Sequence, residues 1–290
     1  MTDSLTRFVF EHAPVKGGVV QMTETWRTIQ QHADYPAPLK NVLGELLAAA
    51  ALLTSGIKFD GSLVLQLHGT GPVKLIVVEA TSQHTLRATA KWDGELKATT
   101  LAGLLGRGRF VMTLDQSKAG KQNYQGIVPL EGQSVADILT HYMESSEQLE
   151  TRIYLAAGDD TVGGMLLQKL PDKAAEDNDM WNRVGHLAGT LTAGELLKLS
   201  ANDILLRLFH EETLRRFDQE PLSFCCTCNQ ENVGSMLKLL GRNEVESILA
   251  EQGQIEVRCE FCDSLYVFDA VDAAQLFVEG TLVAGSDAHH

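Results

Sequence analysis

The chain has 290 residues, of which 44% are hydrophobic and 21% are charged, and its formal net charge is −14. A chain of this length is more typical of two domains than of one, and its composition is that of a folded globular protein rather than a disordered one. The acidic excess argues against binding to nucleic acid or to anionic membrane surfaces, because both favour basic proteins.

The sequence contains neither a predicted membrane span nor a predicted signal peptide. The longest apolar run, residues 46–53, is well short of the roughly 20 residues that a spanning helix needs. Residues 1–7 lack the basic start and apolar core of a signal peptide. We therefore expect a cytoplasmic protein, in which clustered cysteines indicate metal or redox chemistry rather than structural disulfides.

The first part of the chain predicts an α+β domain, residues 1–174, with an antiparallel sheet. A proline-containing turn at residues 34–38 precedes apolar residues that recur at helical spacing from Leu39 to Leu53. This pattern predicts a helix that is buried on nearly all sides and ends near Gly56. Further predicted elements are strands at 63–67, 73–79, 85–92, 110–114, 124–130, 152–156 and 165–170, a hairpin turn at 69–72, and a helix at 134–148.

Residues 175–222 predict a partly helical linker. From position 171 to about 186 the chain is polar and acidic and shows no apolar periodicity. Two short helical patterns follow, at residues 193–199 and from Ser200 to Phe209, and Ser200 has the spacing of a capping box with Asp203. Each is apolar on one face and charged on the other, which indicates packing against another part of the protein.

The cysteines are confined to one segment. All five lie between positions 225 and 262, as a Cys-x-Cys pair (Cys226, Cys228), a Cys-x-x-Cys pair (Cys259, Cys262) and Cys225. Two such pairs can place four sulfurs tetrahedrally around one Zn²⁺ ion. We therefore predict a small Cys₄ zinc-binding domain at residues 223–290; the alternative is four buried cysteines used as small hydrophobic side chains.

The C-terminal segment, residues 223–290, is acidic and small. Residues 223–290 carry three basic and eleven acidic side chains, a net charge of 3 − 11 = −8. Such a segment does not suit nucleic acid. A domain of under about 70 residues is rarely stable without a cross-link such as a disulfide or a bound metal ion. Structural zinc contributes roughly 10–16 kcal/mol of apparent binding energy in zinc-finger peptides. Loss of the metal is expected to unfold it.

The same site can act as a redox switch. Zinc-bound cysteine is held as thiolate, the form that reacts with oxidants, and a disulfide would remove two ligands at once. Cys259 and Cys262 can pair with ordinary geometry, whereas Cys226 and Cys228 would close a small, strained ring. Three readings stay open on this chemistry: a switch, a purely structural zinc module, which is the more common use, and a thiol–disulfide oxidoreductase using Cys259 and Cys262.

Motifs along nearly the whole chain resemble the heat shock protein 33 family of redox-regulated holdase chaperones. They are residues 34–38, 43–47, 59–61, 66–72, 124–128, 146–152, 163–168 and 266–268, together with the two cysteine pairs. The resemblance implies a non-enzymatic protein with no catalytic residues. Its reduced form, with Zn²⁺ on Cys226, Cys228, Cys259 and Cys262, is implied to be inactive.

The resemblance also implies how the protein is activated. Oxidation pairs Cys226 with Cys228 and Cys259 with Cys262, zinc leaves, and the C-terminal domain and linker unfold. The oxidised protein, commonly a homodimer, then binds unfolded client proteins without ATP and passes them later to an ATP-driven foldase chaperone. Two positions depart from the family pattern: Cys225 is a fifth cysteine directly before the ligand pair, and Asn229 stands where serine is more frequent.

Overall fold

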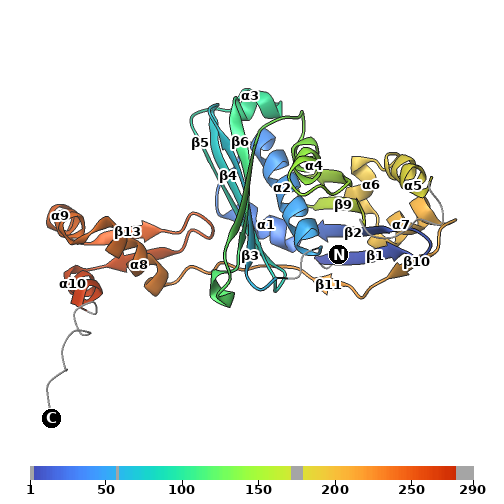
Figure 1. The fold of residues 1–290 in the computed structure, drawn as a ribbon. Helices are drawn as coiled ribbons and strands as arrows, with labels where there is room; N and C mark the ends of the chain where they lie inside the picture. The colour runs from blue at the N-terminus through green and yellow to red at the C-terminus, as the bar shows by residue number, and fades with distance from the viewer. Residues whose placement is uncertain (1–2, 57–58, 171–178, 279–290) are drawn as a thin grey trace, which may run out of the picture. The chain divides into compact units, whose positions relative to one another are not determined.

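The computed structural model describes residues 3–56, 59–170 and 179–278, and the chain divides into two compact units. Unit 1 is Met1–Cys225 and unit 2 is Cys226–His290. Both mix helices with strands, as the predicted α+β class requires (Figure 1). The expected boundary between residues 174 and 175 lies outside the described residues.

The first sheet of unit 1 has the strand order β10-β1-β2-β9-β8, with β11 also pairing with β1, and all of these pairs are antiparallel. Neither β1 nor β2 was predicted from the sequence. Both strands have two buried faces, so alternate residues enter different cores. The strands of this sheet are β1 (Ser4–Phe10), β2 (Val15–Met22), β8 (Thr151–Ala157), β9 (Val162–Lys169), β10 (Leu214–Arg216) and β11 (Glu220–Pro221).

The second sheet has the order β12-β5-β4-β3-β6-β7. It is antiparallel except for β12, which runs parallel to β5. The five longer strands match the predicted ones, and the predicted hairpin turn joins β3 to β4. The strands are β3 (Ser62–Gly69), β4 (Val73–Thr81), β5 (Thr85–Trp92), β6 (Gly108–Asp115), β7 (Tyr124–Pro129) and β12 (Ser223–Phe224).

The helix α2 (Ala37–Thr54) lies between the two sheets and forms the centre of unit 1 (Figure 1). It contacts β2, β8 and β9 of the first sheet and β3, β4 and β5 of the second. By length and composition alone, its 18 residues could cross a membrane. The inference that no segment is long enough to span a membrane is therefore corrected. In the fold, however, 72% of these residues are buried. The prediction of a helix buried on nearly all sides is confirmed.

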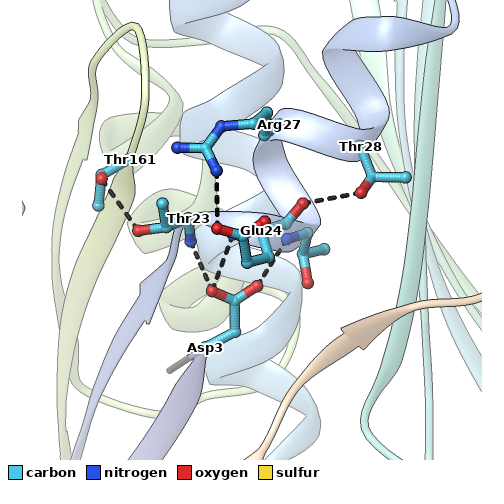
Figure 2. Close-up of polar contacts among 7 residues, drawn as sticks. Asp3, Thr23, Glu24, Arg27, Thr28 and Thr161 are labelled. Carbon is cyan, nitrogen blue, oxygen red and sulfur yellow. Dashed lines mark hydrogen bonds and ion pairs between the residues drawn. The ribbon is translucent and has the colours of Figure 1, made fainter. Parts of the chain in front are cut away.

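The helix α1 (Glu24–Gln31) is capped by a residue from another element. Thr23 stands at the N-cap, but its hydroxyl bonds to Thr161 Oγ1 at 3.1 Å and accepts nothing from the helix. Asp3 accepts instead, taking the backbone N–H groups of residues 23 and 24 on Oδ1 and that of Thr25 on Oδ2 (Figure 2). The other helical elements described before residue 171 are α3 (Leu101–Leu105), a 3₁₀ turn (Ser117–Ala119) and α4 (Val135–Ser145).

Three short helices cover the other face of the first sheet: α5 (Met180–Ala188), α6 (Ala193–Lys198) and α7 (Ala201–Phe209). The two predicted helical patterns correspond to α6 and α7, and the Ser200 hydroxyl accepts from the N–H of Asp203 at 3.2 Å. The expectation of an irregular chain up to about residue 186 is wrong from Met180 onward. Its beginning, residues 171–178, lies outside the described residues.

Gly185 gives helix α5 room for the Arg152 side chain, which packs against it from the sheet. A Cβ on Gly185 would lie 1.0 Å from Nη1 of Arg152, which comes from β8. The Arg152 guanidinium stacks 4.8 Å from the ring centre of Trp181, and the Tyr154 hydroxyl donates to the carbonyl of Gly185 at 3.3 Å. The arginine and glycine within α5 interrupt the apolar periodicity of its sequence, so this helix was not predicted from the sequence.

The described part of unit 2, residues 226–278, contains one hairpin, three helices and a small core. The core consists of six buried apolar residues: Val233, Leu237, Val245, Ile255, Phe268 and Ala273. The elements are α8 (Gln230–Leu240), α9 (Arg242–Gln252), β13 (Ile255–Arg258), β14 (Leu265–Phe268) and α10 (Ala270–Val278).

Candidate metal centre

The four cysteines predicted as ligands come together at one end of the β13–β14 hairpin. Cys259 and Cys262 lie in the turn of the hairpin, and Cys226 and Cys228 lie in the segment that leads into α8. All four sulfur atoms lie within 4.8 Å of one another, although 30 residues lie between the two pairs.

Backbone hydrogen bonds hold the turn that carries Cys259 and Cys262 in place. The N–H of Asp263 donates to the carbonyl of Cys259 at 2.9 Å, and the N–H of Cys259 donates to the carbonyl of Ser264 at 3.0 Å. Asp263 has a φ of +56°, a left-handed conformation that aspartate tolerates better than most residues. These contacts make the turn tight enough for both of its sulfurs to point to the same side.

Asn229 fixes the other segment. Its side chain caps α8 by accepting the N–H of Asn232 at 2.7 Å, and the Asn232 side chain donates to the carbonyl of Thr227 at 2.9 Å. Asparagine and serine are both strong N-cap residues. The departure from the family pattern at position 229 therefore preserves the cap and leaves the neighbouring Cys228 anchored.

The sulfur distances fit a four-thiolate metal site. Cys226 Sγ lies 3.7 Å from Cys259 Sγ, and Cys228 Sγ lies 3.3 Å from Cys262 Sγ. A disulfide would require about 2.05 Å, whereas tetrahedral zinc with ligands at about 2.3 Å separates its sulfurs by about 3.8 Å. All four cysteines are only half-buried. That exposure argues against the alternative of buried hydrophobic cysteines.

Two polar side chains that sequence analysis did not single out as site residues contact the sulfurs. The Tyr266 hydroxyl donates to Cys228 Sγ at 3.0 Å, and Ser264 Oγ lies 3.2 Å from Cys262 Sγ. The signals were present in the sequence, because Ser264 follows Cys262 by two residues and Tyr266 alternates with the buried Phe268 on β14.

The cluster makes the four thiols unequal. Burial raises the pKa of Cys228 to about 12, although the hydrogen bond from Tyr266 acts in the opposite direction and lowers it. Burial also opposes ionisation of Cys262, but the hydroxyl and backbone of Ser264, with Cys228 and Cys226, lower its pKa to about 7. The bond to Cys228 raises the pKa of Tyr266 to about 12. A divalent cation among the sulfurs would favour the thiolate form of all four.

The fifth cysteine belongs to a different part of the fold. Cys225 is exposed, and its backbone N–H donates to the carbonyl of Leu86 at 3.1 Å, which continues the pairing of β12 with β5. Its sulfur is not among the four that gather. In this geometry Cys225 is part of unit 1, one residue before the first candidate ligand.

Comparisons with known proteins agree along nearly the whole chain. The family described as "Hsp33 protein" matches residues 3–269. The "33 kDa chaperonin" of Chromobacterium violaceum is 50% identical over 289 residues, covering 99% of this chain and 98% of that protein. The protein of the same name from Methylobacillus flagellatus is 48% identical over 292 residues, covering 100% and 99%.

A solved structure has the same fold. The crystal structure of the 33 kDa chaperonin (heat shock protein 33 homolog) from Thermotoga maritima matches with a TM-score of 0.80. The match covers 94% of this chain and 97% of that one, at 24% sequence identity. At this identity the likeness concerns the fold.

Proposed function

Because this chain belongs to the Hsp33 protein family, we propose that it is a redox-regulated, ATP-independent holdase chaperone. Membership of the family supports a chaperone function, and with it the binding of unfolded client proteins. The observation that carries the regulatory part is the gathering of four half-buried sulfurs within 4.8 Å in a unit with a small core. The role is one of binding, not of enzymatic turnover.

The reduced protein holds one Zn²⁺ ion on Cys226, Cys228, Cys259 and Cys262. Zinc supplies a tetrahedral cross-link between the hairpin turn and the segment before α8. Tyr266 and Ser264 orient the sulfurs through their hydrogen bonds. Because only six buried apolar residues form the core among residues 226–278, this cross-link supplies much of the folding free energy of the unit.

Activation is an oxidation of the four cysteines. In each pair two thiolates lose two electrons to one molecule of hydrogen peroxide, which takes up two protons from solvent and is reduced to two molecules of water. The products are the disulfides Cys226 to Cys228 and Cys259 to Cys262, a pairing inferred from the family. Each disulfide removes two sulfurs from the ligand set, so zinc is released and unit 2 loses its cross-link.

The linker responds next. We assign residues 1–174 to a chaperone domain, 175–222 to a metastable linker and 223–290 to a redox-sensing domain. Release of α5, α6 and α7 would expose the buried apolar face of the first sheet, which includes Phe8 and Phe10. That surface would hold clients in the bacterial cytoplasm, with the oxidised protein as a homodimer, until an ATP-driven foldase chaperone accepts them.

The test compares reduced and oxidised protein. A chemically unfolded client is diluted into zinc-loaded reduced protein, or into protein treated with peroxide at raised temperature, without ATP, and aggregation is followed by light scattering. We expect suppression by the oxidised sample alone. Cys225→Ser retains all four ligands and should behave as wild type, whereas Cys262→Ser should lose zinc and the dependence on oxidation.

Other outcomes identify the alternatives. Zinc content that does not change with peroxide, together with no suppression in either sample, indicates a structural zinc module. Catalytic turnover of a dithiol substrate indicates an oxidoreductase. Equal suppression by both samples indicates a chaperone without a switch, and restoration of the difference in Cys225→Ser would then assign the fault to Cys225.

A further inference from the structure

A second candidate site lies in unit 1 and shares no residue with the cysteine cluster. It is a cavity of about 710 Å³ where the C-terminal end of α2 meets both sheets. This volume falls within the roughly 300–1,000 Å³ of typical small-molecule sites. The walls are mostly aliphatic and come from α2, α4, β6 and β9: Leu52, Leu53, Met112, Met143 and Leu166.

Most of the charged groups in the cavity wall already have partners. Glu147 accepts from the hydroxyls of Tyr142 at 2.8 Å and Tyr124 at 3.0 Å. Lys169 pairs with Glu150. Arg7 pairs with Glu220, although its Nε is buried without a hydrogen-bond partner among the described residues.

Lys16 is different. It lines the cavity, and within the described part of the chain its ammonium group has no hydrogen bond or ion pair. Its Nζ lies 3.3 Å from where a Cβ on Gly56 would stand, directly at the end of α2. Burial lowers the pKa of this amine, so a negative charge beside it would be favourable. The cavity therefore combines apolar walls with one unsatisfied cation.

We propose that this cavity binds a medium-chain or long-chain carboxylate, with the alkyl chain against the aliphatic walls and the carboxylate on Lys16. A single amine suits a singly charged carboxylate better than a phosphate group, which favours several donors. Burial of each methylene contributes about 0.8 kcal/mol, so the chain supplies affinity and Lys16 supplies selectivity.

A structural role for Lys16 competes with this proposal. A cation near the last carbonyl groups of a helix stabilises the helix, and Lys16 lies at the end of α2. The two roles differ in what they predict. A ligand-binding lysine discriminates between a carboxylate and an alcohol of the same chain length, and a lysine that only stabilises α2 does not.

The experiment is calorimetric titration of the reduced, full-length protein with decanoate and with 1-decanol, each below its aggregation limit. We expect saturable binding of one decanoate per chain and weaker binding of decanol. Lys16→Met should weaken decanoate binding at least about tenfold and leave decanol binding unchanged. Lys74→Met is the matched control, because Lys74 is an exposed lysine that pairs with Asp93.

A second variant tests the location. Leu114 lines the cavity and is only half-buried, so Leu114→Trp should fit the fold, fill the space and weaken both ligands. No saturable binding of either compound overturns the proposal. Equal affinity of wild type and Lys16→Met for decanoate also overturns the proposal. This holds even if the variant has a lower melting temperature, because that result would show only a structural role for Lys16. These outcomes are independent of the chaperone assay, since the reduced protein is used throughout.

Discussion

Asp3 shows how one carboxylate can replace a local helix cap. It is buried, lies directly before β1, and accepts the backbone N–H groups of residues 23 to 25 at the start of α1. Asp3→Ala should lower the free energy of unfolding by about 1–3 kcal/mol, because it leaves buried donors without an acceptor. Denaturant unfolding measures the change.

The control for Asp3 is Asp93→Ala, which removes an exposed partner of Lys74 and should cost under about 1 kcal/mol. Asp3→Asn keeps one acceptor oxygen and should fall between wild type and alanine. Equal stabilities of the two position-3 variants and wild type would contradict the capping role.

Glu45 is a second informative residue, because it lies on the core helix α2. Burial raises the pKa of its carboxyl from 4.5 to about 7. The folded state therefore binds the proton more tightly than the unfolded state. The stability associated with Glu45 is highest below about pH 4.5, falls as the pH rises towards about 7, and is lost above it.

Glu45→Gln should thus stabilise the protein by about 1–3 kcal/mol at about pH 8 and by much less at about pH 5. Thermal or denaturant unfolding at both pH values measures the difference. Glu144→Gln, on an exposed position of α4, is the matched control and should show no such dependence on pH. A gain for Glu45→Gln that is the same at both values would refute the assignment.

At the scale of elements, the layer of α5, α6 and α7 packs on the first sheet through a shared apolar core that includes three phenylalanine rings. Phe209 of α7 is 2% exposed and lies edge-on to Phe10, with ring centres 5.2 Å apart. Phe209→Ala should cost about 3–5 kcal/mol of packing free energy in this layer. Amide hydrogen exchange should therefore quicken in α5 to α7 while α2 stays protected.

The same helix offers a matched control. Leu206 is 68% exposed, so Leu206→Ala should change stability by less than about 0.5 kcal/mol. Under the proposed function, Phe209→Ala should also require a smaller extent of cysteine oxidation than wild type before it binds unfolded clients. Exchange that quickens equally in α2 would show that the layer is not a separate cooperative unit.

At the scale of the whole molecule, the two units differ greatly in their cores. Unit 1 has two large clusters of buried apolar residues, one around α2 and one beneath α5 to α7, and unit 2 has one small cluster. Under the proposed function, removal of zinc by a chelator should unfold unit 2 and release α5 to α7, while the part of unit 1 around α2 stays folded. Hydrogen exchange resolved by segment measures both responses in one experiment.

In Cys262→Ser, which lacks one proposed ligand, the chelator should cause little further change. Persistent protection of α8 and α9 after complete loss of zinc would mean that the core of unit 2 suffices without a cross-link. Loss of protection throughout both units would mean that unit 1 also depends on the metal.

Several features were determined by the sequence alone. The strands β3 to β7 and the helix α2 have strong local sequence patterns, which predicted them. The spacing of the Cys-x-Cys and Cys-x-x-Cys pairs predicted a four-thiolate metal site from the sequence alone. These signals are local: each depends on residues a few positions apart.

Other features were decided only by tertiary structure. The strand β2 contains Gly17, a poor strand residue, because the ring of Phe8 lies 2.2 Å from where its Cβ would stand. In helix α5, Gly185 leaves space that the Arg152 side chain of β8 occupies. The cap from Asp3, the contact of Tyr266 with Cys228 and the cavity beside Lys16 all join residues distant in sequence, which no local pattern encodes.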